Sequence, residues 1–276
     1  MENLKEHPLY SKHTLDSVMS SLWDFYRRKF FALFITSLIF SVATHLLMLN
    51  FNLNDLQNFT DPMEVLEKVR GMILPIAIIS IVSLYFTVVI HYYVIYNPVD
   101  RDVTILSSTY KSLKYFFPYL IIIILLSFFG SIAMALGLLV FIIGIFFAAI
   151  YIASLYMFFL PVLMVEGTDI GNAIARTFSL VHKRFWINIG WVAVFIVILM
   201  VISVILSGII LIPFSGSFLK IMVNPEEASN IMDFASNPLY IILSSAANAL
   251  YLPALPVFAT ILYFHGRASD ELVTTP

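Results

Sequence analysis

The sequence predicts an all-α integral membrane protein with six transmembrane helices. Two observations lead to this fold class. Of the 276 residues, 61% are hydrophobic and only 12% are charged, whereas a soluble domain carries about 25% charged residues. The apolar residues also fall into long uncharged runs, and about 20 such residues are enough to cross a bilayer as a helix. Most of the outer surface is therefore expected to face lipid.

The apolar runs predict a single membrane domain over residues 1–276. The uncharged stretch from Tyr115 to Val165 would measure about 75 Å as one helix, against a hydrocarbon core of about 30 Å. It therefore predicts a helical hairpin, with Gly137 near its midpoint. The six expected spans cover residues 30–49, 72–96, 115–136, 140–164, 185–211 and 239–264, between a leader at 1–29 and a tail at 265–276.

The distribution of lysine and arginine predicts the orientation. The leader, the tail and two connecting segments hold 12 of these residues, whereas the connections on the opposite side hold three. Basic residues concentrate on the cytoplasmic side of membrane proteins, so both termini are expected in the cytoplasm. The first apolar run follows a charged leader with no small-residue cleavage site after it, so it is expected to stay in the mature protein. The opposite connections, 50–71 and 212–238, are expected to form acidic, partly helical caps.

The three inner segments share a pattern. They read LDSVMSSLWDFYRRKFF, VTILSSTYKSLKYFF and IGNAIARTFSLVHKRFW, ending at Phe31, Phe117 and Trp186. Basic and aromatic residues on an amphipathic helix favour the membrane interface. The pattern predicts three helical hairpins, each preceded by an interfacial elbow helix; alternatively, it only reflects the topological bias of cytoplasmic connections. The residues expected to contact lipid headgroups are Trp23, Arg27, Arg28, Lys29, Lys111, Lys114, Lys183, Arg184 and Trp186.

The spans hold few groups that perform chemistry. Their interiors contain no Asp, Glu, Lys or Arg, although ion-coupled transporters normally carry such a residue. His45 and His91 are expected at opposite depths, which disfavours a shared metal site. The chain contains no cysteine, and its net charge of −2 argues against nucleic-acid binding. We therefore expect no catalytic residue, no metal and no cofactor.

The sixth expected span contains two prolines, Pro253 and Pro256. Each proline leaves a backbone carbonyl without its helical partner. Two interpretations follow: a broken helix that faces a cavity, as in some transporters, or a kink that fits this helix around the bundle. Asn248, with Ser244 and Ser245 one turn earlier, is the expected polar contact between helices.

The stretch Pro161 to Trp186 resembles a segment of a family of bacterial six-span proteins. This family includes the membrane domain attached to some glycerophosphodiester phosphodiesterases and the YciC-like proteins. Four residues match the pattern of the segment: Pro161, Glu166, Ala173 and Ser179. The tail from Ile261 to Leu272 also resembles the family's ending, but departs from it at His265-Gly266. The resemblance implies a bacterial inner membrane and an all-helical fold with elbow helices, and it implies no activity.

Together these features predict a non-enzymatic inner-membrane accessory or scaffold subunit. Its expected partners are the phospholipid bilayer and other inner-membrane proteins, in a complex of the secretion or envelope-assembly type. The alternative is a transporter or lipid-translocating protein with a cavity lined by the proline-broken sixth helix. An intramembrane enzyme is not supported, because no acidic or histidine groups are expected to converge at one depth.

Overall fold

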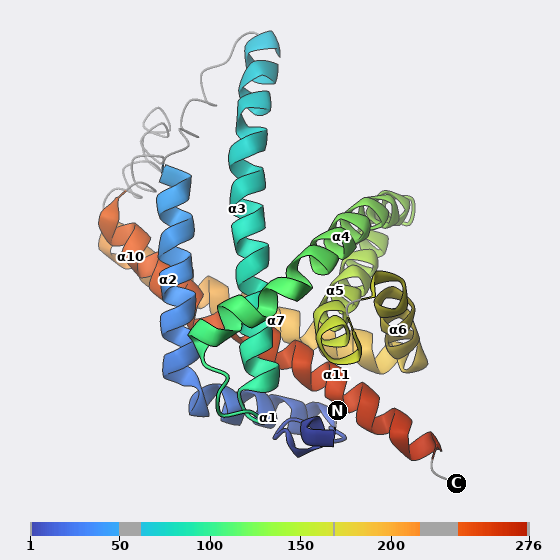
Figure 1. Cartoon of the computed structure of the whole chain (residues 1–276). Coiled ribbons are helices and arrows are strands. Elements are labelled where there is room, and N and C mark those ends of the chain that lie inside the picture. The colour runs from blue at the N-terminus through green and yellow to red at the C-terminus, as the bar shows by residue number, and fades with distance from the viewer. Residues whose placement is uncertain (1, 50–61, 168, 216–236, 275–276) are drawn as a thin grey trace. The chain divides into compact units, whose positions relative to one another are not determined.

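A computed structural model describes residues 2–49, 62–167, 169–215 and 237–274. Every regular element in these ranges is helical (Figure 1), which confirms the all-α fold class. The α-helices are α1 (Leu15–Arg28), α2 (Phe30–Leu49), α3 (Pro62–Tyr96), α4 (Ile105–Leu138), α5 (Phe141–Glu166), α6 (Ile170–Lys183), α7 (Phe185–Leu211), α10 (Pro238–Tyr251) and α11 (Ala254–Thr274). Short 3-10 helices cover Glu2–Glu6 and Ile212–Phe214.

Six helical segments are apolar and long enough to cross a membrane, as the sequence predicts. Helices α2 and α7 have the bounds expected for the first and fifth spans. The six segments are Phe30–Met48, Val69–Tyr96, Ile105–Leu138, Phe141–Glu166, Phe185–Phe214 and Pro238–Glu271. Residues 62–71, the second half of the first expected acidic cap, form the first part of α3. Residues 50–61 and 216–236 lie outside the described part of the chain.

The chain forms two compact units. Unit 1 comprises residues 1–32, 85–198 and 253–276, and unit 2 comprises residues 33–84 and 199–252. The core of unit 1 lies in the second half of α5 and in α11, where the side chains from Val257 to Phe264 are fully buried. Phe258 of α11 stacks on Phe195 of α7 with ring centroids 3.9 Å apart. Apolar packing of spans against one another therefore builds unit 1.

Helices α1 and α6 are separate from the spans that follow them. Each has 14 residues, and the backbone leaves helical geometry at Lys29 (φ −108°, ψ 13°) and at Arg184 (φ −133°, ψ 49°). Thr14 and Asp169 cap the two N-termini by accepting hydrogen bonds from backbone N–H groups. The interruptions fall at the basic residue that precedes an aromatic pair in both sequences.

The separate helix expected within residues 103–117 is absent, since this segment continues into the span as one helix, α4. Thr104 and Ser107 form the capping box that begins α4. Lys114 lies only ten positions after Thr104, whereas Lys29 and Arg184 lie 15 positions after Thr14 and Asp169. The shorter segment lacks the length of a separate four-turn helix before its basic residue. The third apolar helix thus begins at Ile105, ten residues before the expected position.

Helices α4 and α5 are joined by Leu139 and Val140 and pack along each other. Their closest approach is between Gly137 and Gly144. A Cβ atom built on Gly137 would lie 2.7 Å from the carbonyl oxygen of Gly144, and one built on Gly144 would meet the carbonyl oxygen of Gly137. The two backbones are therefore in direct contact, which only glycine permits.

The sixth apolar segment is divided into two helices. Helix α10 ends at Tyr251 and α11 begins at Ala254, so the break falls on Leu252 and Pro253. Pro256 lies inside α11. Helix α11 also runs to Thr274, so most of the expected tail at 265–276 is helical. A proline cannot donate the next helical hydrogen bond, which accounts for the break at Pro253.

Replacing Gly144 by alanine is expected to destabilise the protein by about 1–3 kcal/mol, because the new methyl group overlaps the backbone of α4. A lower unfolding midpoint in detergent micelles, followed by circular dichroism, is the expected observation. Gly190→Ala is the matched control: this helical glycine of α7 has no atom within 4 Å of an added Cβ. An equal loss of stability in both variants would contradict the close contact.

Candidate functional site

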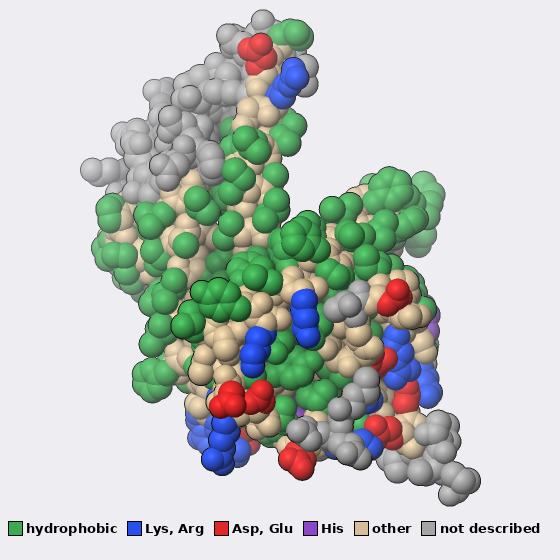
Figure 2. Space-filling model, in the orientation of Figure 1, with side chains coloured by type: hydrophobic (Ala, Val, Ile, Leu, Met, Phe, Trp, Pro, Cys, Tyr) green, Lys and Arg blue, Asp and Glu red, His purple; other side chains and the backbone are tan. Residues whose placement is uncertain are grey.

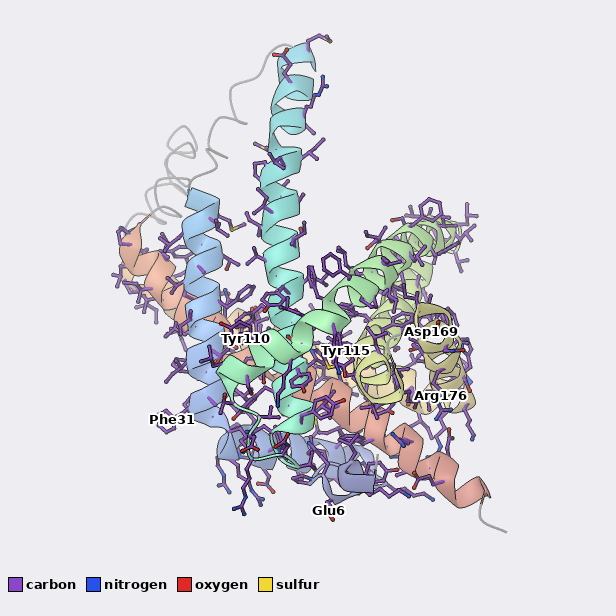
Figure 3. The ribbon with its side chains drawn as sticks, viewed as in Figure 1. Glu6, Phe31, Tyr110, Tyr115, Asp169 and Arg176 are labelled. Atoms are coloured by element: carbon purple, nitrogen blue, oxygen red, sulfur yellow. The ribbon has the colours of Figure 1, made fainter. Side chains whose placement is uncertain are left out.

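Glu166, the last residue of α5, joins this helix to α6 and α11. Its carboxylate accepts hydrogen bonds from Nε of Arg176 at 3.0 and 3.2 Å. It also accepts a hydrogen bond from the hydroxyl group of Tyr263 at 2.9 Å. Arg176 lies on α6, as Figure 3 shows, and Tyr263 lies on α11. One carboxylate thus connects three helices of unit 1.

Asp270 of α11 extends this contact into an ionic network. Its two carboxylate oxygens lie 3.1 Å from Nη1 of Arg176 and 2.5 Å from Nζ of Lys183. Burial acts to lower the pKa of Arg176, but the Glu166 and Asp270 carboxylates outweigh it and raise this pKa above its ordinary value. Arg176 therefore stays charged, and it binds both carboxylates. Charged side chains gather at this end of unit 1 in Figure 2.

Only part of the network was predicted from the sequence. Glu166 belongs to the segment that carries the family resemblance, and Lys183 was expected at the membrane interface; Arg176, Tyr263 and Asp270 were missed. The sequence does contain a pattern that could have predicted Tyr263 and Asp270. Arg267 lies four residues after Tyr263, and Asp270 lies three residues after Arg267. That spacing places them on one face of α11. The expected span ended at residue 264, so this shared face is predicted only if the helix continues to Asp270.

A surface pocket of about 510 Å³ lies beside Glu166. Three of the four residues that match the family pattern, Glu166, Ala173 and Ser179, line it, while Pro161 is buried within α5. Its complete lining is Val162, Glu166, Gly167, Asp169, Asn172, Ala173, Ala175, Arg176 and Ser179. All of these residues come from the last turn of α5, the α5–α6 connection and the first three turns of α6. The pocket therefore belongs to the same local structure as the ionic network.

Residues 2–13 of the leader bind the rest of unit 1 through histidines. Nε2 of His7 donates to the carbonyl oxygen of Val94 at 3.1 Å, and Nδ1 accepts from the N–H of Leu9 at 3.1 Å. The backbone N–H of His13 donates to Nδ1 of His265 at 2.9 Å. Burial lowers the pKa of His7 from 6.5 to about 4. His7 is thus held as the neutral ring, with both nitrogen atoms bonded.

The expected interface residues divide into two groups. Lys29, Lys183 and Arg184 form internal contacts: Nζ of Lys29 donates to Oδ1 of Asn97 at 2.6 Å, and Nη1 of Arg184 lies 3.2 Å from Nε2 of His265. Lys183 is nevertheless exposed, as are the six remaining residues: Trp23, Arg27, Arg28, Lys111, Lys114 and Trp186. The two basic residues at the helix interruptions, Lys29 and Arg184, therefore have structural contacts in unit 1.

Unit 2 contains a polar pocket of about 240 Å³. Nδ1 of His45, on α2, lies 2.8 Å from the carbonyl oxygen of Ser41 and 3.2 Å from Oγ of Ser245 on α10. Asn248 accepts a hydrogen bond from the hydroxyl group of Tyr251 at 2.9 Å. The lining is His45, Ser203, Leu206, Ser207, Ile210, Leu211, Tyr240, Ser244, Ala247, Asn248 and Tyr251. Hydroxyl, amide and imidazole groups therefore gather within the apolar segments.

The other expected residues take structural positions. Pro253 and Pro256 belong to unit 1 and are buried there. The hydroxyl group of Thr260 donates to the carbonyl oxygen of Pro256 at 2.7 Å. His91 is buried, and its Nδ1 donates to the carbonyl oxygen of Thr87 at 2.8 Å. Within the described residues, no group of three His, Asp or Glu side chains is placed to hold a metal ion.

Comparison with known proteins gives no match: no family model, no curated protein and no solved structure is significantly similar to the chain. The resemblance of Pro161 to Trp186 to the six-span family therefore stays a prediction. The function has to be inferred from the contacts and surfaces of the chain itself.

Replacing Glu166 by alanine is expected to destabilise unit 1 by about 1–3 kcal/mol, because it leaves Arg176 and Tyr263 without their shared acceptor. Hydrogen exchange should show faster exchange in α6 and α11. Asp24→Ala is the control, since it removes an exposed pair with Arg27 whose atoms are 3.8 Å apart; such pairs contribute little. Similar exchange in the two variants would rule out a connecting role for Glu166.

Residues 2–13 are expected to detach as the pH falls from 6.5 to 4. The docked leader holds His7 neutral, so it binds fewer protons than the released leader in this range. The free energy that stabilises the docked leader is therefore fully present above pH 6.5, and up to about 3 kcal/mol of it is lost by pH 4. Proteolytic cleavage of the leader across this pH range measures the change. His7→Gln keeps a donor for Val94 but does not titrate, so its pH dependence should be weaker; an unchanged profile would contradict the assignment.

Proposed function

We propose that the protein is a non-enzymatic accessory subunit of a bacterial inner membrane, which docks another membrane protein and engages the lipid of the inner leaflet. Both termini lie in the cytoplasm in this proposal, following the 12-to-three distribution of basic residues. The spans form three hairpins, and α1 and α6 are elbow helices at the interface. A secretion or envelope-assembly complex is the proposed setting.

The observation that carries this proposal is the apolar arm, defined as residues 128–147 at the junction of α4 and α5. Because Gly137 and Gly144 bring the two backbones into contact, the large side chains around them point outward. Nine of these side chains are more than 60% exposed: Phe128, Phe129, Leu138, Leu139, Val140, Phe141, Ile142, Ile143 and Phe146. Figure 2 shows the arm as a hydrophobic surface. It offers a large, uncharged contact area within the bilayer, where helices associate through van der Waals packing.

The charged end of unit 1 supports the lipid-binding part of the proposal. Trp23 of α1 and Trp186 at the start of α7 are 60% and 74% exposed. Tryptophan favours the headgroup region of a membrane, and each nearby basic residue adds about 1 kcal/mol of attraction to anionic lipid. The Glu166 network connects α6 to α11, and Trp186 follows the end of α6 by three residues.

Affinity purification after mild solubilisation is expected to recover at least one other membrane protein in a constant ratio, identified by mass spectrometry. Truncating the arm in the variant Ile142→Ala/Ile143→Ala/Phe146→Ala should lower this recovery, because it removes exposed contact area and keeps the surface apolar. The matched control, Val204→Ala/Ile205→Ala/Ile209→Ala, removes exposed side chains of α7. Recovery of the isolated chain alone, or equal recovery with both variants, would refute docking through the arm.

The polar pocket of unit 2 favours a second candidate function, transport of a small uncharged polar solute. His45, Ser207 and Asn248 line it, and polar groups within membrane spans mark substrate pathways. Helix α10, which lines the pocket, ends directly before the break at Leu252 and Pro253. A broken helix beside a cavity is a feature of several transporters.

This second function predicts solute uptake by proteoliposomes, with glycerol as the first test solute. Asn248→Leu should abolish uptake above the level of protein-free liposomes, because it removes a polar group and fills the pocket. Replacing Pro253 and Pro256 together by alanine should also abolish it if the break is required. Ile205→Leu, at an exposed position of α7 outside the pocket lining, serves as the control. Absence of uptake in the unmodified protein would leave the accessory function as the better account.

A further inference from the structure

An apolar groove of about 350 Å³ runs between α4, α5 and α6 in unit 1. Its size falls within the range of about 300–1,000 Å³ that is typical of ligand sites. Apart from the Tyr151 hydroxyl group, its lining is hydrophobic or glycine: Ile122, Leu125, Leu126, Phe129, Gly130, Ala133, Tyr151, Ile152, Leu155, Phe159, Ile174 and Phe178. Phe129 and Phe178 are 63% and 39% exposed, so the groove opens to the surroundings of the helices.

The groove has the length of one leaflet's acyl chain. Along α4, its lining extends from Ile122 to Ala133, which corresponds to about 16 Å at 1.5 Å per residue. Half of the hydrocarbon core measures about 15 Å. At the edge formed by Tyr151, the hydroxyl group of this residue lies 3.3 Å from Nε2 of His182 on α6.

Two lysines precede the groove on the same helix. Lys111 lies 11 residues before Ile122 and 18 before Phe129, which is about three and five helical turns. It therefore shares the face of α4 that lines the groove, and Lys114 follows it one turn later. Both side chains are exposed, and neither forms an ion pair within the described residues. Nζ of Lys114 lies 4.8 Å from the ring centroid of Tyr115.

We propose that this surface binds one anionic phospholipid, with an acyl chain in the groove and its phosphate at Lys111 and Lys114. The apolar lining matches the chain, and the two unpaired cations match the phosphate. Lys114 lies eight residues before Ile122, which is about 12 Å along the helix axis. The glycerol backbone and the first carbons of the acyl chain would span this distance. The inference rests on the proposed function only in placing these lysines in the inner leaflet.

The test uses the full chain in phosphatidylcholine nanodiscs that contain a minor fraction of phosphatidylglycerol with a photoreactive diazirine on one acyl chain. Mass spectrometry is expected to find label on the groove segments, near Phe129 to Ala133 and Ile152 to Leu155. Ala133→Phe fills the groove and should lower this labelling about tenfold. Ala135→Phe is the control, since Ala135 is exposed on the same turn but does not line the groove.

The lysine variant Lys111→Gln/Lys114→Gln tests the headgroup contact. It should abolish the preference for the phosphatidylglycerol probe over a phosphatidylcholine probe with the same chain, whereas Lys12→Gln in the leader should retain it. Uniform labelling of all exposed apolar helices would overturn the groove site, and so would equal labelling of the Ala133→Phe and Ala135→Phe variants. An unchanged preference in the lysine variant would overturn the phosphate contact. Copurification through the arm is measured separately, so failure of the accessory function and failure of the lipid site are distinguishable.

Discussion

The contact of one carboxylate with two helices determines how unit 1 is held together at its charged end. Glu166 ends the longest stretch of the chain without a charge, and there it accepts hydrogen bonds from Arg176 and Tyr263. Helix α6 is short and amphipathic, and its buried face contributes only four residues. Asp270 adds a second carboxylate to Arg176. Partly buried charges are stable only when they are paired, so α6 and the end of α11 take their positions from this network.

The two 14-residue helices indicate that part of the threefold pattern is structural. Helices α1 and α6 share their length, a side-chain cap at the N-terminus and an interruption at the basic residue 15 positions after the cap. Lys29 and Arg184 are fixed at these interruptions by Asn97 and His265. In α4 the corresponding segment is five residues shorter, and the helix continues. A change in segment length thus decides whether the basic residue ends a helix or lies on its exposed surface.

Three surfaces of different chemical character carry the proposed functions. The arm packs through glycine backbones and turns its large side chains outward. The first part of α4 leaves Lys111 and Lys114 exposed above an apolar groove, because no interruption turns them inward. Unit 2 instead places His45, Asn248 and several serines around a small polar pocket. The three proposed functions therefore have different chemical requirements, and the polar pocket shares no residue with the other two surfaces, whereas the arm and the groove share Phe129, Gly130 and Ala133.

The all-α fold, the six apolar segments and the bounds of α2 and α7 follow from the sequence alone, since uncharged length decides whether a helix can cross lipid. The sequence also indicated the interruptions at Lys29 and Arg184 through the basic residue before an aromatic pair. Only the tertiary structure decided that α4 begins at Ile105, that α11 extends past residue 264 and that Glu166 meets Tyr263 97 positions away. Such contacts depend on which helix faces pack together, and hydropathy carries no information about partners that are distant in the chain.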